Sequence, residues 1–300
     1  MTLDILIMQV FSGFSLFSVL VLMALGLTIA FGLMGVINMA HGELMAMGSY
    51  MTYVTSLVFQ RYFPEFMGWY FIIGIGVAFV VTFAFGFLLE RCFIRFMYNR
   101  PLDTLLATWG LSLVLQQVFR QVFGPKEVSV PTVEWLQGAW KISEGLELPL
   151  NRIFIIGLTL VIAGAVFLFL YRSRWGLRIR AVTQNRAMAG AAGINTARVD
   201  AVTFALSCGL AGIAGSSFTM LASTGPVSGQ QYLVDTFIVV VFGGVESLLG
   251  TFLSAFAIGQ TQISLEYLTT GSMAKAITLM VVIVLLFFRP NGLFAAKVRR

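Results

Sequence analysis

The chain has 300 residues, of which 58% are hydrophobic and 11% are charged, and its formal net charge at pH 7 is +6. Several apolar runs reach the length of about 20 residues that crosses a bilayer core, so the sequence predicts an all-α polytopic membrane protein. Spans and short connectors take up the whole length. This excludes a second soluble domain of ordinary size and makes residues 1–300 a single transmembrane domain.

In chain order, the apolar runs predict spans near residues 9–33, 44–59, 69–89, 103–123, 152–171, 200–222, 248–267 and 272–288. The second of these is short for a hydrocarbon core of about 30 Å. Residues 223–246 contain only one compact apolar run, which Asp235 and Glu246 flank. We interpret this stretch as a broken or re-entrant segment, which brings the predicted bundle to about eight or nine spans.

The first span ends in a polar motif, Asn38-Met-Ala-His41-Gly42-Glu43. Glu43 is the only formally charged residue of the first two predicted spans and the segment between them, and a charge at the bilayer centre costs roughly 2.5 to 3.5 kcal/mol on insertion scales. Two interpretations are open. The motif is either a hydrogen-bonded break in the helix near the inner interface, or a place where Asn38, His41 and Glu43 contact a passing solute.

The span at 103–123 carries Thr108, Ser112 and Gln116 at i, i+4 and i+8, which places these polar side chains on one helix face. The stripe serves either hydrogen bonding between helices, typically about 0.6 kcal/mol per pair, or the lining of a solute path. Asp235, in the broken segment, likewise either caps a half-helix or lies on that path.

Small residues recur at every fourth position on two later spans, in the patterns Ala205-x3-Gly209, Ala211-x3-Gly215 and Thr251-x3-Ala255-x3-Gly259. Helix faces of this kind let backbones approach closely. They predict a compact bundle and are found in membrane proteins of every function.

Basic residues cluster in three regions, which the positive-inside rule assigns to the cytoplasm. These regions are the connector with Arg91, Arg95 and Arg100, the loop 172–199, and the tail 289–300 with Lys297, Arg299 and Arg300. Loop 124–151 mixes acidic and basic residues and is assigned to the outside. Parity of the spans then places the N-terminus outside as well.

Loop 172–199 is more patterned than a simple tether. Its first half is rich in arginine, and residues 187–193 consist mainly of alanine and glycine. The pattern predicts a short helix with a low-profile face that docks into a groove of another protein. The alternative is a basic loop that lies on anionic lipid. Asn195 or Thr196 is predicted to cap the span that follows.

The sequence lacks the motifs of several enzyme classes. It has no G-x4-G-K-[ST] phosphate-binding loop, no G-x-S-x-G and no H-E-x-x-H pattern. It has one histidine, and Cys92 and Cys208 are interpreted as separate thiols. We therefore expect no catalytic residue, no metal and no bound cofactor on this chain. No nucleic-acid partner is expected either, because the basic residues fall in membrane connectors. Transport remains.

Six segments together resemble one known family. They are Gly26-Leu-Thr28, Gly35-Val-Ile-Asn38-Met-Ala-His41-Gly42-Glu43, Gly48-Ser-Tyr50, the loop from Arg174-Trp175-Gly176 to Gly193-Ile-Asn195-Thr196, Val241-Phe-Gly243-Gly244-x3-Leu248-x-Gly250, and Arg289-Pro290-x-Gly292-Leu293-Phe294. In this order they resemble the branched-chain amino acid type permeases of ABC importers, nearly end to end. The segment Arg100 to Gln117 is more similar to the urea permease subfamily than to the leucine/isoleucine/valine permeases.

The resemblance implies partners that the residues alone do not name. They are a second, homologous permease, two cytoplasmic P-loop ATPases that use the ATP, and an extracytoplasmic solute-binding protein. It also implies that the ATPases touch the loop after the fifth span, at Arg178, Arg180, Arg186, Ala189 and Gly193. The outer loop, with Trp135 and Trp140, is a surface either for the binding protein or for the membrane interface.

The expected function is that of a permease subunit in the lipid of the bacterial inner (plasma) membrane, moving a small polar solute by alternating access. The resemblance of Arg100 to Gln117 to the urea permeases implies urea as the solute, and the hydrogen-bonding groups of Thr108, Ser112 and Gln116 fit a neutral amide. A branched-chain amino acid is the alternative solute. A passive small-solute channel and a structural membrane scaffold are alternatives of other classes, against which the patterned loop and the buried motif argue.

Overall fold

The computed structural model describes residues 3–98, 100–143, 146–289 and 292–294. Seven helices in this part of the chain are long and apolar enough to span a bilayer. This confirms an all-α, multi-pass membrane protein.

The described elements follow one another in the order α1 (Leu3–Leu27), a π-helical segment (Thr28–Leu33), α2 (His41–Tyr62), α3 (Tyr70–Cys92), α4 (Pro101–Phe123), β1 (Ala139–Ser143), β2 (Leu146–Pro149), α5 (Leu150–Arg172), α6 (Arg174–Gln184), α7 (Arg186–Ala191), α8 (Thr196–Phe218), α9 (Ser228–Gly243), α10 (Leu248–Leu268) and α11 (Gly271–Phe288). Every predicted span coincides with one of these helices. The strands β1 and β2 form an antiparallel hairpin within the predicted outer loop.

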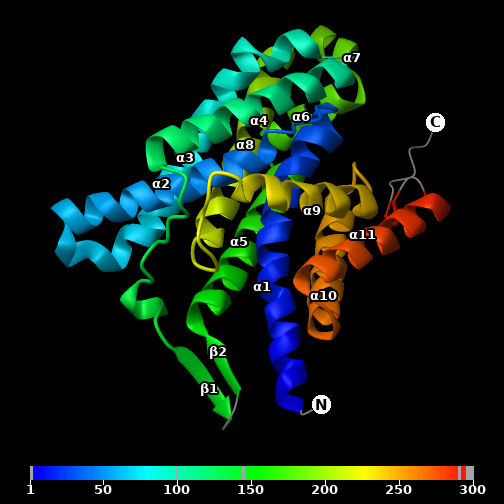
Figure 1. Cartoon of the computed structure of the whole chain (residues 1–300). Helices are drawn as coiled ribbons and strands as arrows, with labels where there is room; N and C mark the ends of the chain where they lie inside the picture. The colour runs from blue at the N-terminus through cyan, green and yellow to red at the C-terminus, as the bar shows by residue number, and fades with distance from the viewer. Residues whose placement is uncertain (1–2, 99, 144–145, 290–291, 295–300) are drawn as a thin grey trace.

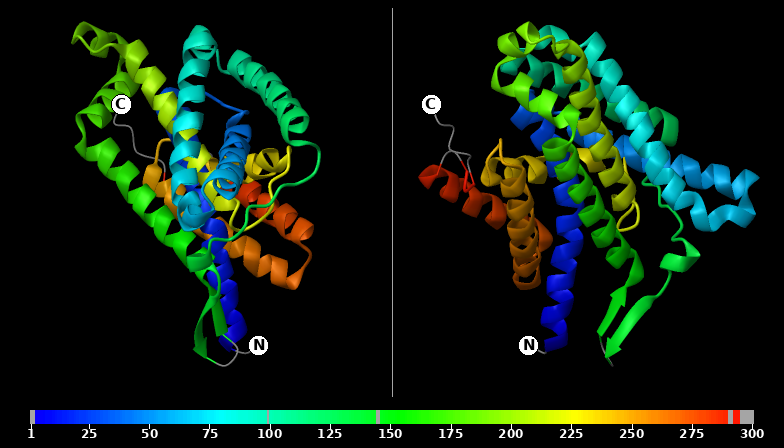
Figure 2. Two further views of the ribbon diagram at one scale, coloured as in Figure 1. Left: turned by 90° about the vertical axis from the view of Figure 1, so that its left-hand side faces the viewer. Right: turned by 180° about the vertical axis from the view of Figure 1, so that it is seen from behind.

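The two ends of the bundle differ as the charge pattern predicts. Figure 1 shows the start of α1 and the β1–β2 hairpin at one end and the helices α6 and α7 at the other, and both views of Figure 2 show the same separation. The arginine-rich loop and the mixed-charge loop therefore lie on opposite sides of the bundle. Of the predicted basic tail, residues 290–291 and 295–300 lie outside the described residues, and so do Lys297, Arg299 and Arg300.

Helix α8 lies in the core, and its glycines are the points of contact with its neighbours. Gly209 packs against the ring of Phe79 and Gly212 against Thr82, both on α3. On another face, a Cβ at Gly215 would overlap the backbone carbonyl of Met45 on α2. The small residues that the sequence analysis identified thus let α2, α3 and α8 approach at backbone distance.

The chain folds back on itself after α1. The π-helical segment Thr28–Leu33 ends this helix, and Gly35 adopts φ +68°, a conformation that favours glycine. The ring nitrogen Nε2 of the fully buried His41 lies 3.1 Å from the carbonyl oxygen of Met23. Met23 is ten residues, or about 15 Å of helix, before Leu33. Helix α2 therefore begins inside the bundle.

The helix at the predicted second span is longer than predicted. Helix α2 has 22 residues and a length of about 33 Å, but it is not among the seven helices that are apolar enough to span a bilayer. It is longer than predicted at both ends, because a count of apolar residues includes neither His41 and Glu43 in its first turn nor Gln60 and Arg61 in its last. The amide of Leu44 bonds to the carbonyl of Ala40, 3.2 Å away, which starts the helix there.

Helix α9 is the short element of the region 223–246. Its 16 residues measure about 24 Å, less than the hydrocarbon core, as expected of the predicted broken segment. Figure 1 shows it running crosswise to the long axis of α1. Near its first residue Gly229 packs against the backbone of Gly42, and at its last residue Gly243 packs against Gly250 of α10. Close packing between glycines thus holds both ends of α9 against neighbouring helices.

Candidate functional site

The two polar features that the sequence analysis treated separately meet in the structure. The side chain of Glu43 is 1% exposed, and its Oε1 atom accepts hydrogen bonds from Ser112 Oγ at 3.1 Å and from Gln116 Nε2 at 2.8 Å. Bonds to a carboxylate are stronger than bonds between neutral groups. The stripe on α4 therefore stabilises the carboxylate at the start of α2.

The first residue of the same stripe holds the break before α2. The amide of Met39 donates to Thr108 Oγ1 at 3.0 Å, and Thr108 in turn donates to the carbonyl of Thr104 at 2.8 Å. Asn38 Oδ1 accepts a bond from the amide of Ala40 at 3.0 Å. Side-chain hydrogen bonds, rather than a regular series of backbone hydrogen bonds, thus hold the non-helical segment between α1 and α2.

Three buried polar atoms of the motif have no hydrogen-bond partner among the described residues: Asn38 Nδ2, His41 Nδ1 and Glu43 Oε2. Buried polar groups are nearly always paired in folded proteins, so each of these atoms requires an explanation. Each of the three side chains thus has one polar atom that is hydrogen-bonded within the protein, as the helix-break interpretation expects. Its other polar atom is unpaired, and contact of these unpaired atoms with a solute stays a prediction.

The sequence analysis missed one member of this cluster. Gln230 on α9 places its Oε1 atom 3.3 Å from Gln116 Nε2, and Gln230 is exposed on the surface of the chain. Through it the buried cluster reaches the surface. The signal in the sequence was a run of polar and small residues, Ser228 to Gln231, at the start of the re-entrant segment.

Asp235 does not belong to this cluster, which corrects its grouping with Asn38 and Glu43. Its carboxylate forms an ion pair with Lys275 Nζ on α11 at 2.8 Å. Five residues separate it from Gln230, which is about 140° around a helix. The two residues therefore face different neighbours, and Asp235 fixes α9 to α11.

We expect Gln116→Leu to destabilise the protein by about 1–3 kcal/mol, because the buried carboxylate of Glu43 loses its shortest hydrogen bond. The measurement is the thermal unfolding midpoint in detergent. Gln117→Leu is the matched control, since Gln117 is the exposed neighbour of Gln116 on the same helix. Equal midpoints for the two variants would contradict the role assigned to Gln116.

Loop 172–199 contains two helices, α6 and α7, rather than the single short helix predicted from its basic first half and the small residues that follow. Each begins at a side chain that caps its first turn. Ser173 Oγ accepts from the amide of Gly176 at 3.0 Å, and Asn185 Oδ1 accepts from Met188 at 3.0 Å. Asn195 caps α8 in the same way, as predicted, because its Oδ1 accepts from Arg198 at 3.0 Å. Asparagine and serine caps make the loop a fixed helix–turn–helix.

The five residues predicted to touch an ATPase have different environments. Arg178 is exposed and lies over the ring of Trp175, while Arg180 lies over Tyr171. Gly193 is exposed and follows α7 with φ +81°. Ala189 is 5% exposed and packs into the core, so its predicted role as a docking surface is wrong.

The small and apolar residues that α7 exposes are instead Ala187, Met188, Gly190 and Ala191, and Met188 is 67% exposed. The alanine and glycine residues of α7 therefore lie on two sides of one short helix, one that packs on the core and one that is exposed. A sequence pattern of small residues alone does not distinguish the face that packs inward from the face that is free.

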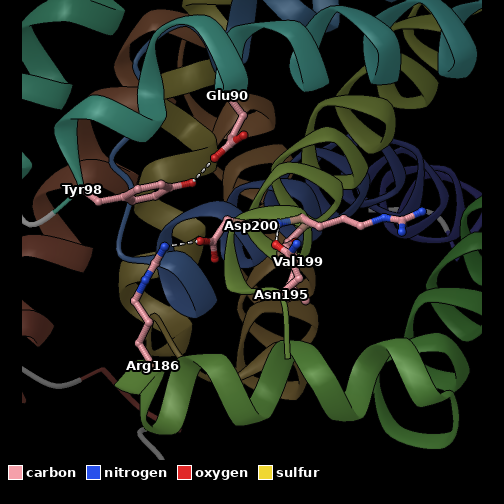
Figure 3. Close-up of polar contacts among 8 residues, drawn as sticks. Glu90, Tyr98, Arg186, Asn195, Val199 and Asp200 are labelled. Atoms are coloured by element: carbon pink, nitrogen blue, oxygen red, sulfur yellow. Dashed lines mark hydrogen bonds and ion pairs between the residues drawn. The ribbon is translucent and has the colours of Figure 1, made fainter. Parts of the chain in front are cut away.

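Arg186 connects α7 to the body of the protein, as Figure 3 shows. Its Nη2 atom lies 2.6 Å from Asp200 Oδ2 on α8, and its guanidinium lies 5.0 Å from the ring centroid of Tyr98. The Tyr98 hydroxyl donates to Glu90 Oε1 on α3 at 2.8 Å. Burial raises the pKa of Tyr98, so this hydroxyl stays protonated and keeps donating.

This network was only partly visible in the sequence. Glu90 is 2% exposed and was missed, because it stands at the end of an apolar run next to Arg91 and resembles an ordinary interfacial charge. Together, Arg186, Asp200, Tyr98 and Glu90 join the helix–turn–helix to α3 and α8. The network thus links α7 to two helices that pack directly on one another.

Both tryptophans of the outer loop are exposed, Trp135 to 43% and Trp140 on β1 to 63%. The indole of Trp135 also donates to the carbonyl of Gly68 at 2.6 Å and packs on Phe154, so it is attached to the protein's own bundle. Contact of this loop with a binding protein or with the membrane interface stays a prediction.

The bundle and its seven long apolar helices define a multi-pass membrane protein, and the comparisons show that its class is that of the transport permeases. The chain belongs to the family described as branched-chain amino acid transport system / permease component, whose profile matches residues 9–288. The resemblance stated from the sequence is confirmed at the level of this family. Membership in a permease family of ABC importers implies ATPase and binding-protein partners in general.

Curated relatives agree over nearly the whole length. The chain is 29% identical over 295 residues to the high-affinity branched-chain amino acid transport system permease protein LivH of Escherichia coli (strain K12), covering 95% of this chain and 94% of the relative. It is 27% identical over 291 residues to the protein BraD of Pseudomonas aeruginosa, which has the same description, with coverage of 95% and 94%. It is 23% identical over 297 residues to the probable branched-chain amino acid transport permease protein LivH of Methanocaldococcus jannaschii, with coverage of 92% and 88%.

No solved structure gives a significant match to the chain. The comparisons do not support urea as the solute. They support the alternative solute of the sequence analysis better, since the family description and these three relatives all refer to branched-chain amino acids.

Proposed function

We propose that this chain is a permease subunit of an ATP-driven importer in the cytoplasmic membrane, and that its solute is a branched-chain amino acid. Its partners are a homologous second permease, two cytoplasmic P-loop ATPases and an extracytoplasmic solute-binding protein. The ATPases use the ATP, and this chain holds no cofactor. The observation that carries the proposal is the capped helix pair α6–α7, which lies at the end opposite the β1–β2 hairpin and is joined to the core by the ion pair of Arg186 with Asp200.

In the proposed mechanism the ATPases grip the exposed face of α7 around Met188. Their closure moves α7, and Arg186 transmits the movement to Asp200 on α8. Helix α8 packs against α2 at Gly215 and Met45, so the movement continues to the helix that carries Glu43. The two states differ in this packing, and ATP binding favours one of them over the other.

The hydrogen bonds at Glu43 also bear on the choice of solute. Urea was implied by the subfamily resemblance, and Ser112 and Gln116 fitted it because they offer hydrogen bonds to a neutral amide. In the structure both donors are already bonded to Glu43. This removes that supporting argument for urea.

The complete transporter in sealed cells should take up labelled leucine, and unlabelled isoleucine and valine should compete for that uptake. Excess urea should leave it unchanged, because urea has neither the charges nor the aliphatic side chain of these solutes. Uptake of labelled urea that leucine does not inhibit would show that the solute is wrong. Vesicles that hold this chain alone should show no flux, and flux without ATPases would make the chain a passive channel.

A further inference from the structure

A cavity of about 300 Å³ lies against one face of α1, toward the end of the bundle that carries the β1–β2 hairpin. The cavity is separate from the cluster around Glu43, since it is lined from α1, α5, the turn after α8, α9 and α10. Its volume is at the lower limit of ordinary small-molecule sites, roughly 300 to 1,000 Å³. Its lining residues are Ser12, Ser15, Leu16, Val19, Arg152, Phe218, Leu221, Ala222, Tyr232 and Ile263.

One cation lines this cavity, and the local backbone fixes its position. Asn151 Nδ2 donates to the carbonyl of Met220 at 2.9 Å, and Asn151 Oδ1 accepts from the amide of Arg152 at 2.8 Å. The start of α5 is thereby attached to the turn that follows α8. Arg152 is half-buried, and its Nη1 atom donates to Ser12 Oγ at 3.2 Å.

Arg152 has unused capacity for an anion. In the part of the chain that the structure describes, no carboxylate lies within 4.0 Å of its guanidinium. A guanidinium has five N–H donors in a fork that matches a carboxylate. A half-buried arginine that faces a cavity without a counter-ion is suited to bind a carboxylate from solution.

The rest of the cavity provides the complementary surfaces. Leu16, Val19, Phe218 and Leu221 form an aliphatic and aromatic wall. A second cavity of about 350 Å³ shares Ser12 and Ile263 with the first and is also lined by Glu266. The two cavities adjoin at Ser12 and Ile263, and together they form a groove that Arg152, the apolar wall and Glu266 line.

We propose that this groove is an outward-facing binding site for an aliphatic α-amino acid. Arg152 binds the α-carboxylate, and the apolar wall takes the side chain. The site rests on the proposed function and deepens it, because it gives the solute a place on the permease before passage. A neutral amide would leave the charge of Arg152 unused.

The test is protection of a cysteine introduced in place of Ser12 in the complete transporter. Ser12→Cys is placed in a Cys92→Ser background, because Cys92 is exposed and Cys208 is buried. A charged thiol reagent added from outside should modify the introduced thiol, and leucine should slow the modification in a saturable way. Leucinamide, which lacks the carboxylate, should need at least a ten-fold higher concentration for half-protection.

Arg152→Gln should raise the leucine concentration for half-protection at least ten-fold and remove the preference of leucine over leucinamide. Arg152→Lys should give an intermediate value, and Arg61→Gln, an exposed arginine outside the groove, should change nothing. Uptake of leucine without protection of the introduced thiol would overturn the site and leave the proposed function standing. A thiol that the reagent does not reach, or one protected equally by leucine and leucinamide, would also overturn the site. Failure of leucine uptake itself would refute the proposed function instead.

Discussion

Gly215→Leu should prevent the bundle from folding. A Cβ at this position already overlaps the Met45 carbonyl and lies 2.9 Å from the Ser49 amide, so the obstructing atoms belong to the backbone of α2 and cannot rotate away. Overpacking of a dense core lowers the stability of the fold by roughly 1–3 kcal/mol even where neighbouring side chains can move aside. At Gly215 the neighbours are backbone atoms, which cannot move aside in this way. We expect almost no monodisperse protein after extraction into detergent and size-exclusion chromatography.

Gly164→Leu is the matched control for this variant. Gly164 stands on α5, is exposed, and has no atom within 4 Å of its would-be Cβ. Both variants replace a helical glycine by leucine, so both gain about 1 kcal/mol in helix propensity. Equal yields of folded protein would show that α2 and α8 are not packed as described.

Arg186→Ala is expected to abolish coupled uptake while the ATPases keep hydrolysing ATP. The side chain of Asp200 is 6% exposed, so the variant leaves a buried carboxylate without its cation. Breaking a buried pair costs about 3–5 kcal/mol, and the half-exposed position of Arg186 lowers this to about 1–3 kcal/mol. The larger effect is on transport, because α7 loses its attachment to α8.

The combined variant Arg186→Ala with Asp200→Asn separates the two effects. It removes the unpaired charge, so stability should return while uptake remains low. Arg100→Ala is the control for loss of an ion pair as such, because Arg100 and Asp103 are 3.7 Å apart and both exposed. Full uptake in the Arg186→Ala transporter would show that this ion pair carries no coupling.

Much of the fold could be predicted from the sequence because membrane spans follow from a local property, the length of an apolar run. The caps of the helices are local as well, which is why Asn195 was predicted correctly. Contacts between distant residues are not local. The bond from Gln116 to Glu43 joins residues 73 positions apart, and only the packing of α4 on α2 brings them together.

The errors have the same origin. The length of α2 was underestimated because a buried Glu43 looks like the end of an apolar run until its hydrogen bonds to α4 are known. Ala189 was taken for a surface residue because composition does not tell which face of a short helix packs on the core. Gln230 was missed because its role depends on where the short helix α9 begins.

The wide turn at the end of α1 also limits how the sequence can change in length. A π-helical turn holds one more residue than an α-helical turn, and two contacts flank that extra residue. Thr28 Oγ1 lies 2.8 Å from Thr251 Oγ1 in the core, and the carbonyl of Leu33 accepts from Thr183 on α6 at 2.8 Å nearer the surface. Deletion of one residue between 28 and 33 would close the turn as an α-helix and rotate one contact by about 100° relative to the other. We therefore expect this stretch to tolerate substitutions but not a change in length, because the insertion or deletion of one residue would break either the contact of Thr28 or that of Leu33.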